Sequence, residues 1–177
     1  MRGNTKSIAL CGIFSALSIA VMFLGTVIEV FDLTAVAFST FLILLITKFY
    51  GYKWGISTYL SILLLSAIFF LGRFIFIAFV TFGIYPFIKC FFEQKLKNKK
   101  LSWFFKILLF NLTFTILLFW GFSFLFSSDI NEKMLVIEII LSYPIGNLFI
   151  VLYDIVCDKI VTKYKKIIFN LLHWNLF

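Results

Sequence analysis

The sequence has little charge and few of the side chains that catalysis commonly uses. Charged residues make up 14% of its 177 residues, whereas 63% are hydrophobic, and there is one histidine. A soluble domain of this size needs far more polar side chains to cover its surface. The scarcity of charge therefore excludes an ordinary soluble protein and indicates an integral membrane protein whose whole length forms one helical domain.

Motifs of nucleotide and hydrolytic chemistry are also absent. The sequence contains no GxxxxGK[ST] phosphate loop, no HExxH zinc motif and no GxSxG nucleophile elbow. Cys11, Cys90 and Cys157 are far apart and form no CxxC or Cys/His pattern, so they indicate neither a metal site nor a disulfide framework. We expect them to be small buried hydrophobic residues. The sequence thus favours a protein that is not an enzyme and holds no cofactor or metal.

Long apolar segments are what the sequence has in abundance. Hydropathy predicts an all-α fold, a compact bundle of six transmembrane helices with the length that a bilayer requires. The predicted spans lie near 7–28, 34–50, 54–72, 74–92, 104–126 and 134–157. The boundary between the third and fourth spans depends on Gly72 and Arg73. Residues 1–158 form the transmembrane domain, and the basic, then aromatic tail 159–177 is typical of an amphipathic helix on the inner leaflet.

The distribution of positive charge orients the predicted spans. With both termini cytoplasmic, fourteen of the sixteen lysine and arginine residues lie in inner segments, and only Arg73 and Lys133 lie outside. This distribution agrees with the positive-inside rule. The formal net charge of +8 then indicates attraction to anionic membrane lipid and not to nucleic acid. The densest basic segment, 93–106, is either an anchor that fixes the topology or a docking surface for a cytoplasmic partner.

Isolated polar residues within the spans are candidates for function, because their burial in a bilayer is costly. In the sixth span Tyr143, Asn147 and Asp154 share one helical face, since they stand at i, i+4 and i+11. Asp154 is close to the inner boundary and is expected to be either solvated or paired with a lysine. Glu138 lies about one turn below the outer surface, on a different side of the same helix.

Further candidates lie in the fifth span and near the outer surface. Asn111 and Thr115 form an i, i+4 pair that either bonds to another helix or contacts a ligand. Arg73, at a tight outer turn, either binds an anionic group of a ligand or pairs with an acidic residue. Trp120 is one of several aromatic residues near the outer end that could stack on a flat ring, although such residues also form interfacial belts.

Small residues recur on one face of the first span, in the stretch ALCGIFSALSIA of residues 9–20. Ala9, Gly12, Ala16 and Ala20 stack on that face of a helix. Apolar side chains gain little by meeting in lipid, so helices associate there through the close packing that small residues permit. The stripe therefore predicts a packing surface, either for another helix of the same chain or for a different protein.

Together these features resemble the S component of an energy-coupling factor (ECF) transporter. The resemblance rests on a short six-span chain, a basic start, and the opening TKSIALCGIFSALSIAVMF. In that family an Ala-xxx-Ala motif of the first helix docks on a membrane T component, and two ATPases power the complex. The resemblance implies that Gly12, Ala16 and Ala20 form the docking face, with Ala16-xxx-Ala20 matching the motif. It also implies that a vitamin or related small organic molecule binds near the outer face.

The resemblance places the substrate among the outer halves of the fourth to sixth spans and the first loop, GTVIEVFDLT. Glu29 and Asp32 are candidates by their position in this loop. The full set of expected substrate-binding residues is Glu29, Asp32, Arg73, Trp120, Glu138, Tyr143 and Asn147. The expectation is thus a substrate-binding subunit for vitamin uptake in a bacterial cytoplasmic membrane. The alternative is a non-transporting accessory or scaffold protein that packs through the same stripe and binds no solute.

Overall fold

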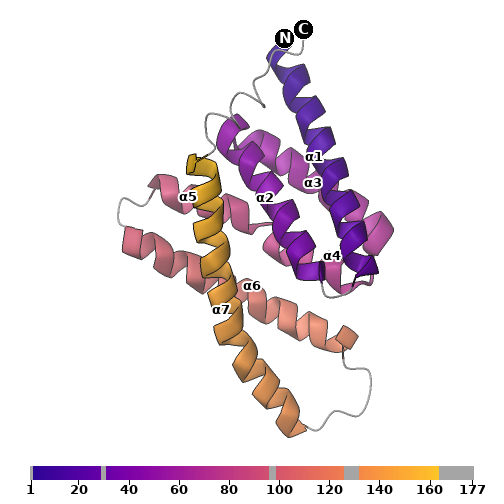
Figure 1. The fold of residues 1–177 in the computed structure, drawn as a ribbon, viewed down its shortest axis with the longest axis vertical. Helices are drawn as coiled ribbons and strands as arrows, with labels where there is room; N and C mark the ends of the chain where they lie inside the picture. Colours follow the sequence, from indigo (N-terminus) through magenta and orange to yellow (C-terminus); the bar gives the residue numbers. More distant parts are fainter. Residues whose placement is uncertain (1, 29–30, 96–98, 126–131, 164–177) are drawn as a thin grey trace.

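A computed structural model describes most of the chain, and all regular structure in the described part is helical (Figure 1). The described residues are 2–28, 31–95, 99–125 and 132–163. Side chains are described over the same ranges except at residues 2–4, 99, 120–125 and 132–139. The predicted all-α fold is confirmed for this part of the chain.

In chain order the helices are α1 (Arg2–Val27), α2 (Asp32–Tyr50), α3 (Tyr52–Phe70), α4 (Phe74–Phe82), α5 (Tyr85–Lys95), α6 (Lys99–Leu125) and α7 (Glu132–Lys163). Short turns join α2 to α3, α3 to α4 and α4 to α5. Within the described ranges, six spans are long and apolar enough to cross a membrane, because α4 and α5 together form one of them. This finding agrees with the six predicted spans and is compatible with a multi-pass membrane protein.

Glycine produces two of the turns that separate these spans. Gly51, between α2 and α3, has a φ of +97°, and Gly72, between α3 and α4, has a φ of +83°. A residue with a Cβ rarely adopts this left-handed conformation, whereas glycine does so at little cost. The Arg73 backbone N–H bonds back to the Phe70 carbonyl at 2.9 Å and closes the second turn. The predicted boundary at Gly72 and Arg73 is therefore confirmed.

The fourth span is interrupted, although the sequence predicted a continuous helix there. The backbone N–H of Gly83 completes the last turn of α4 by bonding to the Phe79 carbonyl at 2.8 Å. Pro86 follows in the first turn of α5, where its missing N–H is tolerated. In a continuous helix the Pro86 ring would clash with the carbonyl of Phe82. The chain therefore ends one helix and begins another within a single span.

The last helix is longer than predicted. It continues to Lys163, so residues 159–163 of the expected tail belong to α7, whereas 164–177 lie outside the described residues. The helix also runs through Pro144. A proline is tolerated inside membrane helices when neighbouring groups satisfy the backbone that it leaves unpaired. The predicted end of the sixth span at 157 is thus too early.

Helix α2 lies at the centre of the packing. It contacts α1, α3, α4, α5 and α7. In α2 and in the α4–α5 span, 56% of the most apolar window is buried, compared with 17% in α7. The largest apolar cluster joins five helices and includes Met22, Val36, Ile62, Phe79 and Leu117. This core holds α1–α4 and the middle of α6 together.

The α6–α7 pair is less embedded than the other helices. Figure 1 shows the end of α6 and the start of α7 projecting beyond the group formed by α1–α5. The two helices contact each other, and α7 also contacts α2. The described part is therefore less compact than the predicted bundle, because α7 is held mainly along its later half.

A methyl group at Gly55 should destabilise this fold, whereas one at Gly12 should not. A Cβ at Gly55 would overlap the buried Thr47 hydroxyl and lie 3.1 Å from Cε1 of Phe87. Such overpacking costs about 1–3 kcal/mol. A Cβ at Gly12 meets no atom within 4 Å, so alanine there gains about 1 kcal/mol of helix propensity. We expect Gly55→Ala to lower the unfolding temperature in detergent and Gly12→Ala to maintain or raise it. An equal effect of both substitutions would contradict the close contact of α2 with α3.

Candidate functional site

The two faces of α1 differ in what they contact. Its buried residues are Ser7, Cys11, Ser15, Ser18, Met22 and Gly25, and the helix packs against α2 and α3. In contrast, Ala9, Gly12, Ala16 and Ala20 are all exposed. The alternative in which this small-residue stripe packs against another helix of the same chain is therefore wrong for the described part of the chain. A second series of small residues, rich in serine, makes the internal contacts instead.

A groove runs beside the exposed stripe, between α1 and α3. Its volume is about 610 Å³, and its lining includes Ala16 and Ala20 from α1 with Leu65 and Phe69 from α3. All of these side chains are apolar. The stripe and the groove together form one apolar surface that can receive an apolar helix or lipid, and we call it the α1 face.

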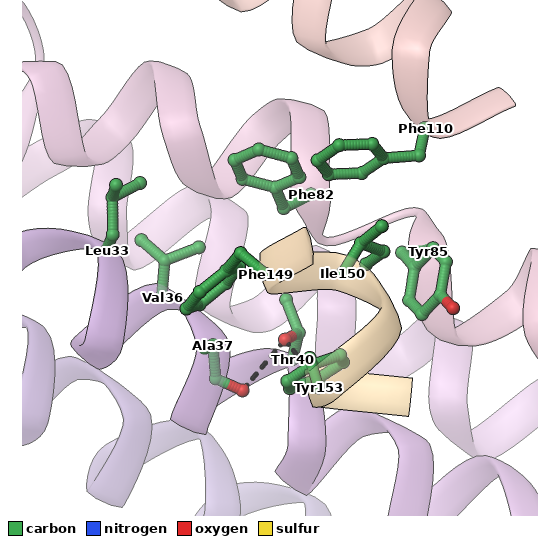
Figure 2. Close-up of a pocket in the computed structure, with 10 residues that line it drawn as sticks. All are labelled: Leu33, Val36, Ala37, Thr40, Phe82, Tyr85, Phe110, Phe149, Ile150 and Tyr153. Atoms are coloured by element: carbon green, nitrogen blue, oxygen red, sulfur yellow. Dashed lines mark hydrogen bonds between the residues drawn. The ribbon is translucent and has the colours of Figure 1, made fainter. Parts of the chain in front are cut away.

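A pocket lies on the other side of α2, between α2, α4, α5, α6 and α7 (Figure 2). Its lining residues are Leu33, Val36, Ala37, Thr40, Phe82, Tyr85, Phe110, Phe149, Ile150 and Tyr153. The cavity itself has a volume of about 30 Å³. The space between the surrounding atoms, counted together with its open side, is about 350 Å³. The pocket is therefore narrow, and none of its ten lining residues is charged.

Aromatic rings and hydroxyl groups lie on opposite sides of this pocket. Figure 2 shows Phe82 and Phe110 together on one side and Thr40 with Tyr153 on the other. The two phenylalanine rings are stacked, with centroids 5.6 Å apart. Oγ1 of Thr40 lies 2.8 Å from the Ala37 carbonyl oxygen and 2.8 Å from the Tyr153 hydroxyl. Either hydroxyl can be the donor in the bond between Thr40 and Tyr153.

An ionic cluster adjoins the hydroxyl side of the pocket. It consists of Lys48, Lys89, Glu93, Lys106, Asp154 and Asp158. The lining residue Tyr85 joins the two sites, because its hydroxyl donates a 2.7 Å hydrogen bond to Oδ1 of Asp154. Buried ionisable side chains at membrane depth are costly and for that reason mark candidate functional sites.

Asp154 is the centre of the cluster. It is fully buried, and its carboxylate accepts from Lys89 at Oδ1 and from Lys106 at Oδ2, the latter at 3.1 Å. Lys89 is also fully buried, and its ammonium contacts Glu93 at 3.2 Å and Asp158 at 2.9 Å. Helices α5, α6 and α7 are thus joined through one carboxylate.

The cluster is balanced in charge. It contains three lysines and three carboxylates, and Lys48 brings α2 into it through Glu93 at 3.3 Å and Asp158 at 3.5 Å. The carboxylates of Glu93, Asp154 and Asp158 lie within 4.8 Å of one another, a spacing that would suit a metal ion. The Lys89 ammonium contacts all three. It therefore supplies the positive charge that these carboxylates require.

The structure brings three predicted residues to the contact between α6 and α7. The Tyr143 hydroxyl lies 2.8 Å from Oγ1 of Thr115, so the interhelical bond expected of Thr115 is confirmed. Asn111 of α6 and Asn147 of α7 each have a buried amide oxygen without a hydrogen-bond partner in the described residues. Asp154 is bonded to Lys106 of α6, so Tyr143 and Asp154 both face α6.

None of the expected substrate-binding residues whose side chains are described lines the pocket. Asp32 begins α2, and Arg73 is exposed immediately before α4. Beside the first loop, an open groove of about 360 Å³ has an apolar lining that includes Ile28 and Phe31. Glu29 lies outside the described residues.

Trp120 and Glu138 belong to α6 and α7, but their side chains lie outside the described ones. The structure therefore does not unite the seven predicted residues in one site. The three cysteines are buried and free, as expected.

Sequence reasoning missed both the pocket and the ionic cluster. From the sequence, Lys89 and Lys106 count only among the positive charges of the inner segments, and the pairing of Asp154 with a lysine is one of two alternatives. The signal that could have found the cluster is complementary spacing. Lys89 and Glu93 stand at i, i+4 on one helix, and Asp154 and Asp158 stand at i, i+4 on another.

Neutralising one partner of the buried pair should destabilise the protein more than neutralising both. Either Asp154→Asn or Lys89→Met leaves uncompensated buried charge, which costs about 3–5 kcal/mol. In the double variant Lys106 still pairs with Glu93 at 2.9 Å, so its loss of unfolding free energy should be smaller than that of either single variant. A denaturant titration of the four proteins in mixed micelles measures this. Lys159→Met, at an exposed position of the same helix, is the control and should change stability by less than about 0.5 kcal/mol. Strictly additive losses would show that the two charges do not act as a pair.

In comparisons with known proteins, no family model, no curated protein and no solved structure matches the chain.

Proposed function

We propose that the chain is the substrate-binding membrane subunit of a micronutrient uptake transporter, powered by separate ATPase subunits. In this proposal the α1 face docks on a membrane protein similar to a T component. The pocket behind α2 holds a small organic substrate. The protein would work in the cytoplasmic membrane of a bacterium, surrounded by lipid, and would carry out no chemical reaction on its substrate.

The observation that carries the proposal is the exposure of the small-residue stripe. Gly12, Ala16 and Ala20 are exposed, while a separate set of residues makes the internal contacts of α1. Small residues permit the close approach through which helices associate in lipid. A helix that already packs through one face has no internal need for a second, so a partner helix is the best physical explanation of the stripe.

Two further features support a division of roles in which the pocket binds the substrate, the α1 face docks on the partner, and separate subunits supply the energy. The pocket lies among helices α2 and α4–α7, away from the α1 face, so docking and substrate binding can occur together. The sequence has no phosphate-loop motif, which fits a subunit whose energy comes from separate ATPases.

One observation favours a second candidate function. A water molecule's centre reaches only about 30 Å³ of the pocket, which is about one water molecule's worth of space. A non-transporting accessory or scaffold protein would need the α1 face but no wider pocket. The two functions therefore differ in whether the isolated chain binds a solute, and they share the docking face.

Enlarging the stripe should remove the partner without unfolding the chain. The variant Gly12→Leu/Ala16→Leu/Ala20→Leu changes exposed positions, so we expect its unfolding temperature to stay close to that of the native chain. Recovery of a membrane partner and ATPases in a mild-detergent pull-down should fall about tenfold, which corresponds to about 1.4 kcal/mol of lost association energy. Mass spectrometry of the eluates identifies the proteins and any bound metabolite.

A matched control enlarges another exposed surface. Ile145, Leu148 and Leu152 of α7 are 65%, 61% and 53% exposed, and their replacement by phenylalanine should leave recovery unchanged. Partners that persist with the α1 variant would refute the docking face. A native chain that elutes alone and empty would argue against both the transporter and the scaffold.

A further inference from the structure

The pocket behind α2 points to a class of ligand. We infer that it binds a small uncharged, mainly apolar molecule with one hydrogen-bonding group, which enters sideways from the lipid between α2 and α7. This inference rests on the proposed function and deepens it, because it assigns the chemical class of the substrate and its route of entry.

The first argument is the depth of the pocket. Tyr85, Phe110 and Phe149 stand near the middle of the candidate spans Phe74–Lys95, Lys100–Phe119 and Ile140–Lys163. The middle of a span lies in the hydrocarbon core of a bilayer. These three aromatic side chains therefore stand at the level of the lipid chains, whereas Leu33, the second residue of the span Asp32–Tyr50, places the α2 edge of the pocket nearer the end of a span.

The second argument is the position of the opening. Leu33 of α2 and Phe149 of α7 both belong to the lining, yet each is 43% exposed. They therefore form a rim on the outer surface of the helix group, where α2 and α7 meet in few places. The rim is apolar, so an apolar molecule can pass it directly from the lipid.

The third argument is the chemistry of the lining. None of the ten residues carries a charge, and the stacked rings of Phe82 and Phe110 form one wall. The Tyr153 hydroxyl is hydrogen-bonded to Thr40 at 2.8 Å, and a hydroxyl oxygen has two lone pairs, so it can also accept a hydrogen bond from a ligand. A ligand hydroxyl or amide N–H matches this acceptor, whereas a carboxylate would meet no positive charge in the pocket.

The neighbouring ionic cluster does not change the preference of the pocket for an uncharged ligand. Its three ammonium groups and three carboxylates are paired with one another, and Asp154 uses both oxygens for Lys89, Lys106 and Tyr85. A charged ligand would have to break these bonds to find a partner. The cluster thus closes one end of the pocket and leaves the lipid side as the entrance.

Photolabelling of the isolated chain in lipid nanodiscs tests this inference. The probe is a medium-chain primary alcohol that carries a diazirine, and its matched analogues replace the hydroxyl with a carboxylate or with hydrogen. We expect the alcohol to label peptides of α2 and α7 that line the pocket. The carboxylate analogue should label them much less at the same concentration in the membrane.

Two variants and one control locate the label. Ala37→Phe fills the pocket and should abolish the specific labelling, whereas Ala9→Phe, at an exposed position of α1, should not affect it. Tyr153→Phe should weaken labelling by the alcohol about fivefold, the effect of one hydrogen bond. The hydrocarbon analogue should label the native chain and Tyr153→Phe equally, which shows that the variant retains its pocket.

The possible contrary results are distinct. Labelling that is spread over all exposed helix faces and persists in Ala37→Phe would overturn the inference, as would equal labelling by the carboxylate analogue. A phospholipid found in the pocket by native mass spectrometry would make it a lipid site and would also overturn the inference. The pull-down with partner subunits is independent of this test. Partners without pocket labelling would refute the ligand class alone, and pocket labelling without partners would refute the transporter alone.

Discussion

The carboxylate of Asp154 is the group on which the second half of the structure depends. It accepts hydrogen bonds from Tyr85 and Lys89 of α5 and from Lys106 of α6. A slide of α7 by one turn would move the Asp154 carboxylate away from Lys89 and Lys106, and of the α5 and α6 carboxylates in the cluster only Glu93 would remain beside them. Loss of a buried partner costs several kcal/mol. Apolar contact supplies little preference for one helix position in lipid, and α7 buries little of its surface. Its register is therefore set mainly by charge.

Helix α2 connects the two surfaces that the proposed function uses. On one side it packs against α1, whose outer face carries the small-residue stripe. On the other side Val36 and Thr40 line the pocket. A partner on the α1 face can alter the pocket only if it prefers one arrangement of these helices, because a ligand shifts an equilibrium by its differential affinity. The α2–α7 gap is the place where such a shift would change access.

The positions of the helices along the chain can be predicted from the sequence better than the contacts between the helices. The span lengths can be predicted from hydropathy. The turn between the third and fourth spans can be predicted from Gly72, because glycine adopts the positive φ of such a turn at little cost. The break at Gly83 was missed because hydropathy does not register a change of direction inside an apolar segment. Lys89 and Lys106 look like headgroup anchors in a linear sequence, since pairing with Asp154 depends on how α5, α6 and α7 pack. The pocket could not be predicted for the same reason, because its ten residues come from five helices.

The wide separation of the cluster residues along the chain has a consequence for biosynthesis. Lys89 and Lys106 emerge from the ribosome well before Asp154, so the two lysines must remain with water or lipid headgroups while α7 is still being made. In the orientation that the sequence predicts, their positive charge favours the cytoplasmic side during this interval. Arrival of α7 then converts the same groups into internal bonds. In a chain that stops before α7, Lys89 and Lys106 would share the one carboxylate of Glu93, which distinguishes it physically from the finished protein.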